Sequence, residues 1–155
     1  MTDYTNTDKY QLKEAKFFKC DLHCHTCLDA RWKGKKISKD YTKEDFAKEF
    51  VAFCRRQKLD AIALTDHNFV NDPKDSVLES LCTEAKKLEQ EGYELTIFPG
   101  FELTTYEGKT GIQLHCILPA DTSTSTASEI LASACKLEAS NRFDGDDPKA
   151  RYQPR

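Results

Sequence analysis

The chain has 155 residues, a formal net charge of −3 and a sequence pI of about 5.8. One domain of this length can bury a substantial core, but a closed eight-fold (β/α) barrel typically needs about 250 residues and is excluded. The acidic balance excludes a globally basic nucleic-acid-binding domain, and no apolar run approaches the roughly 18 to 20 residues needed to cross a bilayer. We therefore expect a soluble protein with no membrane partner.

The first half of the sequence predicts a strand, a helix and a second strand. Residues 1–16 are polar and predict a loose N-terminal arm, and residues 17–22 predict the first strand. Thr42 and Asp45 resemble a capping box, and apolar residues follow them at helical spacing. Residues 60–65 form a short continuous apolar run, which is typical of a parallel strand covered on both faces.

The second half continues the alternation of helices and strands. Its predicted elements are a helix from Asp75 or Ser76 to Gly92, strands at 94–98, 101–105 and 112–118, and a helix at 128–137. This order favours an α/β fold with mainly parallel strands and flanking helices, in which sites form where the strands end. Residues 141–155 show no strand pattern and are interpreted as a linker or a truncated end.

The seven cysteines indicate a reducing environment. Their number is odd, and no secretory signal is evident in the polar N-terminus, which favours free thiols and a cytoplasmic location. Cys24 and Cys27 have the spacing of a zinc-ribbon or redox pair, but no second pair stands at a suitable distance. We expect Cys24 to face away from its histidine neighbours, and Cys20 and Cys116 to be ordinary buried thiols.

The histidines are the strongest signal of chemistry. His23 and His25 are two residues apart at the end of a predicted strand, so both side chains lie on one face. His67 follows the apolar run at 61–64, and His115 lies inside the predicted strand at 112–118. Neutral imidazole is the commonest protein ligand for metals, so this arrangement indicates a metal site, although a buried core position explains His115 equally simply.

Three motifs in order resemble those of the PHP (polymerase and histidinol phosphatase) superfamily. They are Asp-Leu-His-Cys-His-Thr at 21–26, Leu-Thr-Asp-His-Asn at 64–68 and Phe-Pro-Gly-Phe-Glu at 98–102. The resemblance covers residues 17 to about 118 and implies metal-dependent phosphoester hydrolysis on a partial or distorted (β/α) barrel. Family members also carry a closing Asp-x-His motif, whereas no histidine follows His115 here. We therefore expect residues 17–140 to be a PHP-like metal-binding domain that is incomplete at its C-terminal side.

The resemblance also implies which residues hold metal. The ligand positions are His23, His25, His67, Glu102, His115 and Asp29, and the catalytic positions are Glu102 and His67. In this assignment His23 and His25 hold one ion, Glu102 bridges to a second ion on His115, and His67 with Asp29 holds a third. Two or three divalent ions of zinc, manganese or iron are expected, while so many imidazoles disfavour calcium. Asp66 is expected to orient a neighbour or cap its loop.

A basic segment follows the first motif. Residues 31–41 carry five cations and one acid, and the candidate substrate contacts among them are Arg31, Lys33, Lys35 and Lys36. The segment is interpreted either as a solvated loop or as an overhang that guides a phosphate, with Trp32 or Tyr41 stacked on a base.

Three hypotheses for function stay open at this point. The first is a metal-dependent phosphatase or nuclease that acts on a phosphorylated small molecule or a nucleic acid. The second is a catalytically inactive PHP-like regulatory or interaction module, fused to or associated with an ATPase or polymerase-type domain in a larger protein. The third is a single ion that only stabilises the fold.

Overall fold

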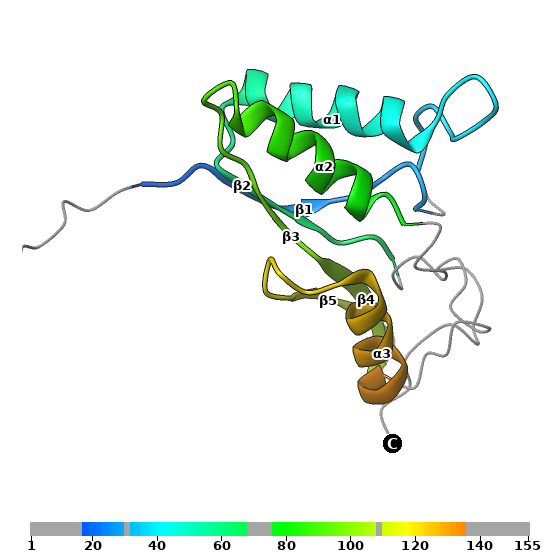
Figure 1. Ribbon diagram of the computed structural model, residues 1–155. Coiled ribbons are helices and arrows are strands. Elements are labelled where there is room, and N and C mark those ends of the chain that lie inside the picture. Colours follow the sequence, from blue (N-terminus) through cyan, green and yellow to red (C-terminus); the bar gives the residue numbers. More distant parts are fainter. Residues whose placement is uncertain (1–16, 30–31, 68–75, 108–109, 136–155) are drawn as a thin grey trace, which may run out of the picture.

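The computed structural model describes residues 17–29, 32–67, 76–107 and 110–135 (Figure 1). The predicted arm at 1–16, the predicted linker at 141–155 and Arg31 lie outside these residues. In chain order the elements are β1 (Cys20–Cys24), α1 (Lys43–Gln57), β2 (Ala61–Leu64), α2 (Leu78–Glu89), β3 (Thr96–Phe98), β4 (Gly100–Glu107), β5 (Thr110–Ile117) and α3 (Thr124–Cys135).

The first three strands form a parallel sheet in the order β1-β2-β3. Figure 1 shows α1 and α2 on the same side of this sheet, as two successive right-handed crossovers in one direction require. The predicted α/β fold with a parallel sheet is confirmed, and the strands described close no barrel. Within the described residues no helix is both long and apolar enough to span a bilayer.

The first strand lies later than predicted, at Cys20–Cys24 instead of 17–22. Apolarity at Phe17 and Phe18 suggested an earlier start, but both side chains are exposed and lie ahead of the strand. Pairing sets the boundary instead, because the Lys19 carbonyl accepts the Asp60 amide at 2.8 Å and Cys20 is the first residue in register with β2.

Local signals in the sequence account for α1. The Thr42 hydroxyl accepts the Asp45 amide at 3.2 Å, and the Asp45 carboxylate accepts the Thr42 amide at 3.0 Å, so the predicted capping box is present. Lys58 ends the helix in the left-handed region with φ of 54°. Phe46 and Val51 are buried against the sheet and α2 and belong to the main hydrophobic core.

A separate small core joins the β4–β5 hairpin to α3. It consists of Phe101, Leu103, Ala127 and Leu131. Helix α3 begins at Thr124, four residues before the predicted start at 128, because the Ser123 hydroxyl accepts the Thr126 amide at 3.1 Å and caps the first turn. This unit holds one wall of the candidate site.

Candidate metal centre

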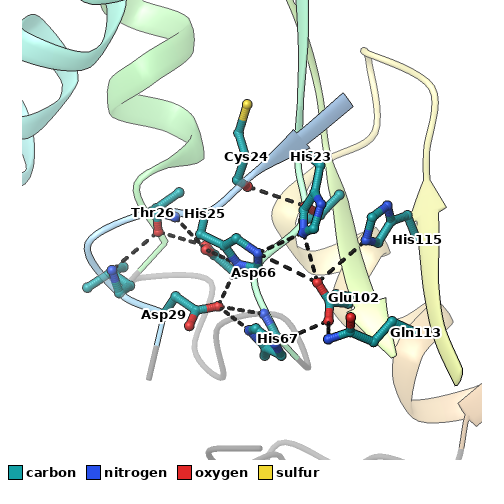
Figure 2. Close-up of polar contacts among 12 residues, drawn as sticks. His23, Cys24, His25, Thr26, Asp29, Asp66, His67, Glu102, Gln113 and His115 are labelled. Atoms are coloured by element: carbon teal, nitrogen blue, oxygen red, sulfur yellow. Dashed lines mark hydrogen bonds and ion pairs between the residues drawn. The ribbon is translucent and has the colours of Figure 1, made fainter. Parts of the chain in front are cut away.

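The ends of β1 and β2 and the β4–β5 hairpin bring all six predicted ligands together (Figure 2). His23 lies in β1 and His25 directly after it, and His67 follows β2. Glu102 and His115 are opposite each other in the antiparallel β4–β5 pair. The expectation that every histidine lies in or at the end of a strand is therefore confirmed.

One buried carboxylate is the focus of the site. Glu102 is 1% exposed, and its Oε2 lies 3.0 Å from Nε2 of His23, 3.5 Å from that of His115 and 3.6 Å from that of His25. The other oxygen, Oε1, lies 3.2 Å from Nε2 of His67. Four imidazole nitrogens thus surround both oxygens of a single side chain, a position suited to a carboxylate shared between ions.

Asp29 fixes two of the imidazoles from behind. Its Oδ2 lies 2.9 Å from Nδ1 of His25 and 2.8 Å from Nδ1 of His67, and the same oxygen accepts the His67 backbone amide at 2.8 Å. The hydrogen bond to Asp29 raises the pKa of His25, while partial burial opposes this rise. When each Nδ1 carries the donated proton, each Nε2 presents a lone pair towards Glu102.

The side chains present fit divalent metal ions. Nε2 of His67 is buried and makes no hydrogen bond with the residues described, although Oε1 of Glu102 lies 3.2 Å away, so its lone pair is available to a metal. Imidazole nitrogens with carboxylate oxygens are ligands of zinc, manganese and iron. Two groups each place three ligand atoms within 4.8 Å of one another: His23, Glu102 and His115 in one, and His25, Asp29 and His67 in the other.

This grouping divides the ligands differently from the sequence-based assignment, which placed His23 and His25 on the same ion. Their Nε2 atoms do meet at 2.9 Å, so the shared face is confirmed. His25 lies beyond the last residue of β1, however, and its other nitrogen turns to Asp29. His25 therefore lies between the two groups and contacts both.

Asp66 supports the centre without entering either group. Its Oδ1 accepts the Thr26 amide at 2.5 Å and its Oδ2 accepts the Thr26 hydroxyl at 2.6 Å, so it ties the loop after β1 to the end of β2. Burial raises the pKa of Asp66 to about 6. The expectation that Asp66 caps this loop is confirmed.

The substitution Thr26→Val should therefore destabilise the protein by about 1 to 3 kcal/mol, because it leaves a buried Asp66 oxygen without its donor at unchanged side-chain volume. Urea unfolding followed by circular dichroism measures the change, with Thr83→Val on the exposed side of α2 as the control. Equal midpoints for both variants would contradict this role.

Gln113 belongs to the candidate site, and the sequence reasoning missed it. Its side-chain amide donates to Oε1 of Glu102, so it orients the shared carboxylate. Gln113 and His115 are two residues apart in β5 and point to one face of the hairpin. Because the strand at 112–118 was predicted, this two-residue spacing could have placed Gln113 on the same face as His115.

The thiols that the structure describes are separate from the centre. Figure 2 shows the Cys24 sulfur directed away from the histidines, as predicted, and burial raises its pKa to about 12. Burial also raises the pKa of Cys27 and of Cys54 to about 11. Cys116 is half-buried, whereas Cys20 is exposed, so the prediction of a buried thiol is wrong for Cys20 because that end of β1 is uncovered.

Alkylation of the native protein should follow this pattern. At a pH of about 8, iodoacetamide should modify Cys20 first, while Cys24, Cys27 and Cys54 stay largely protected, since the thiolate is the reactive form. Peptide mass spectrometry over a time course gives the order, with urea-unfolded protein as the reference. Equal rates of alkylation at Cys20 and Cys27 in the native protein would contradict the burial of Cys27.

The described part of the basic segment packs against α1. The Trp32 ring contacts Phe46 edge-on, with centres 6.0 Å apart, and its Nε1 donates to the Lys35 carbonyl at 3.1 Å. The Lys35 ammonium lies 3.7 Å from the centre of the Tyr41 ring. These side chains contact α1 and each other instead of the histidines. A substrate role for Lys33 and Lys36 stays a prediction.

No family model matches the sequence, and no curated protein matches it. Solved structures that are similar to it include the following two. A candidate metal-dependent phosphoesterase from Bifidobacterium adolescentis is 17% identical with a TM-score of 0.41, over 83% of this chain and 38% of that one. An amidohydrolase from Chromobacterium violaceum, solved with bound sulfate and no metal, is 16% identical with a TM-score of 0.41, over 85% of this chain and 45% of that one. The chain spans less than half the length of either.

Proposed function

We propose that this chain is a metal-dependent phosphoesterase, a phosphatase or nuclease, whose centre holds at least two divalent ions of zinc, manganese or iron. The observation that carries the proposal is the convergence of four imidazole Nε2 atoms on the buried Glu102 carboxylate, within 3.0 to 3.6 Å. The motifs that resemble the PHP superfamily agree with it. Bound ions of this kind supply Lewis-acid stabilisation of a phosphoryl group and lower the pKa of water.

The chain's own residues hold and orient these groups. Glu102 is shared between the ligand sets, Gln113 fixes its carboxylate, and Asp29 fixes the rings of His25 and His67. His23 is 47% exposed and His115 is 32% exposed, so that a substrate phosphate reaches the centre from their side. In this proposal no side-chain nucleophile is needed, because water attacks the phosphorus atom.

The first test measures metal per chain by mass spectrometry, on protein purified without chelator or affinity metal. We expect at least two ions per chain, and their loss in the double variant His23→Ala/His25→Ala. Hydrolysis of nitrophenyl phosphate and of bis(nitrophenyl) phosphate then separates monoester from diester activity. A chain without stoichiometric metal and without hydrolysis of either compound would overturn the proposal.

The second candidate function is a PHP-like interaction module that binds metal without catalysis. Exposed apolar side chains beside the histidines favour it, namely Leu22 in β1 and Leu114 and Ile117 in β5, because such surface is typical of contact with another domain. An ATPase or polymerase-type domain is the partner proposed. Stoichiometric metal with no hydrolysis of either compound would favour this function.

Metal occupancy should fall as the pH is lowered. Imidazole binds metal only when neutral, and the Asp29 carboxylate raises the pKa of His25, so protons displace the metal at a higher pH than an ordinary value of about 6.5 implies. After dialysis, metal analysis should show full occupancy at a pH of about 7.5 and strongly reduced occupancy at a pH of about 5. Unchanged occupancy at the lower pH would argue against imidazole ligands.

A further inference from the structure

A groove lies along α1, and it shares no residue with the two ligand groups of the metal centre. Its volume is about 610 Å³, which is within the range of ligand-binding sites. The residues that matter here are Trp32, Lys35, Lys48, Phe50, Phe53 and Arg56. The groove therefore combines aromatic rings with cations.

Aromatic rings line the groove, and the Phe53 ring is exposed. Phe53 is 50% exposed although it is a large apolar side chain, and the Arg56 guanidinium lies 5.8 Å from the centre of its ring. Phe50 packs on the buried Phe46 with ring centres 5.4 Å apart, and Trp32 contacts the same ring. An exposed ring flanked by a cation, in a groove that is also lined by packed aromatic rings, is suited to stacking on a planar base.

Charge favours an anionic occupant. Residues 32–58 contain nine lysines and arginines against four acids, although the whole chain is acidic. The one acid in the groove, Glu49, accepts the Tyr41 hydroxyl at 2.8 Å, so part of its charge is already engaged. Lys48 and Arg56 thus present positive charge beside the rings.

We propose that this groove binds single-stranded nucleic acid, with bases stacked on Phe53 and Phe50 and phosphates paired with Lys48 and Arg56. Stacking requires unpaired bases, so a duplex is disfavoured. The proposal goes beyond phosphoester hydrolysis and does not depend on it. The Trp32 amide donates to the Asp29 carbonyl at 3.0 Å, so a residue of the groove directly contacts a residue of the candidate metal centre.

The test uses the full chain and a fluorescein-labelled oligothymidylate, with anisotropy as the measurement, in the presence and absence of EDTA. We expect saturable binding in both conditions and weaker binding of the matching duplex. Trp32 is the only tryptophan of the sequence and lies in the groove, so its fluorescence should be quenched by the oligonucleotide. A protein that hydrolyses phosphoesters but does not bind the oligonucleotide would contradict only the groove proposal. A protein that binds the oligonucleotide but hydrolyses no phosphoester would contradict only the proposed function.

Single substitutions test whether the residues of this groove contact the oligonucleotide. Phe53→Ala and Arg56→Ala should each weaken binding by about tenfold, whereas Phe53→Tyr should bind like the parent chain. Phe18→Ala removes another exposed aromatic ring and Lys87→Ala removes another exposed cation. Both residues lie outside the groove, so both variants should leave binding unchanged. Wild-type binding by Phe53→Ala, or equal competition by polyglutamate, would overturn the proposal and favour an acidic peptide. Absence of binding would overturn it as well.

Discussion

Glu102→Gln should remove the bound metal and the hydrolytic activity together. The substitution keeps the size of the side chain but takes away the charge that both oxygens offer to four imidazoles. Changes outside the ligand set typically cost 10 to 100-fold in metal affinity or activity, so we expect a loss above about 100-fold for this shared ligand. Metal analysis and initial rates at saturating metal measure the two losses.

Glu94→Gln is the matched control for this variant, since Glu94 is exposed and lies ahead of β3. It should retain full occupancy and full rate. A Glu102→Gln protein that keeps at least two ions per chain would show that this carboxylate is not the shared ligand. Retention of the ions with loss of rate would restrict its role to the chemical step.

Gly100→Ala should lower both stability and metal affinity. A Cβ atom at this position would collide with the Cys116 carbonyl and would lie 2.9 Å from the Leu64 carbonyl oxygen, and neither backbone can move easily. Overpacking of this kind costs about 1 to 3 kcal/mol. Because Glu102 follows two residues later and its amide bonds to the Asp66 carbonyl at 3.1 Å, the shift should also displace the carboxylate.

A second glycine separates these two effects. Gly92 has φ of 82°, and nothing lies within 4 Å of an added Cβ, so Gly92→Ala strains the backbone away from the centre. Thermal unfolding should show a loss for both variants, while calorimetric metal titration should show weaker binding for Gly100→Ala alone. Equal metal affinity in the two proteins would contradict a positioning role for Gly100.

Local patterns made much of the fold predictable. The capping box at Thr42 and the apolar run at 61–64 act over a few residues, so α1 and β2 appear where expected. The positions of the four histidines were predictable, because each lies in a strand signal or shortly after one. The exposure of Cys20 was not, since it depends on β1 being an edge of the described sheet.

The inner arrangement of the site depends on contacts between distant segments, and the sequence does not display these. One Asp29 oxygen serves His25 four residues away and His67 thirty-eight residues away. The sequence shows that Asp29 is four residues after His25, but it does not show that Asp29 also reaches His67. Gln113 was missed for a similar reason, because only the antiparallel register of β4 and β5 brings it to Glu102.

The candidate ligands come from segments that are far apart in the chain, so that a bound ion would act as a cross-link. An ion held by His23 and His115 would close a loop that contains most of the described fold, and would stabilise the folded state by lowering the conformational entropy of the unfolded chain. By mass action, free metal at 100 times its dissociation constant adds about 2.7 kcal/mol to the free energy of unfolding. In the proposed function, the melting temperature of this protein should therefore rise with the concentration of free metal.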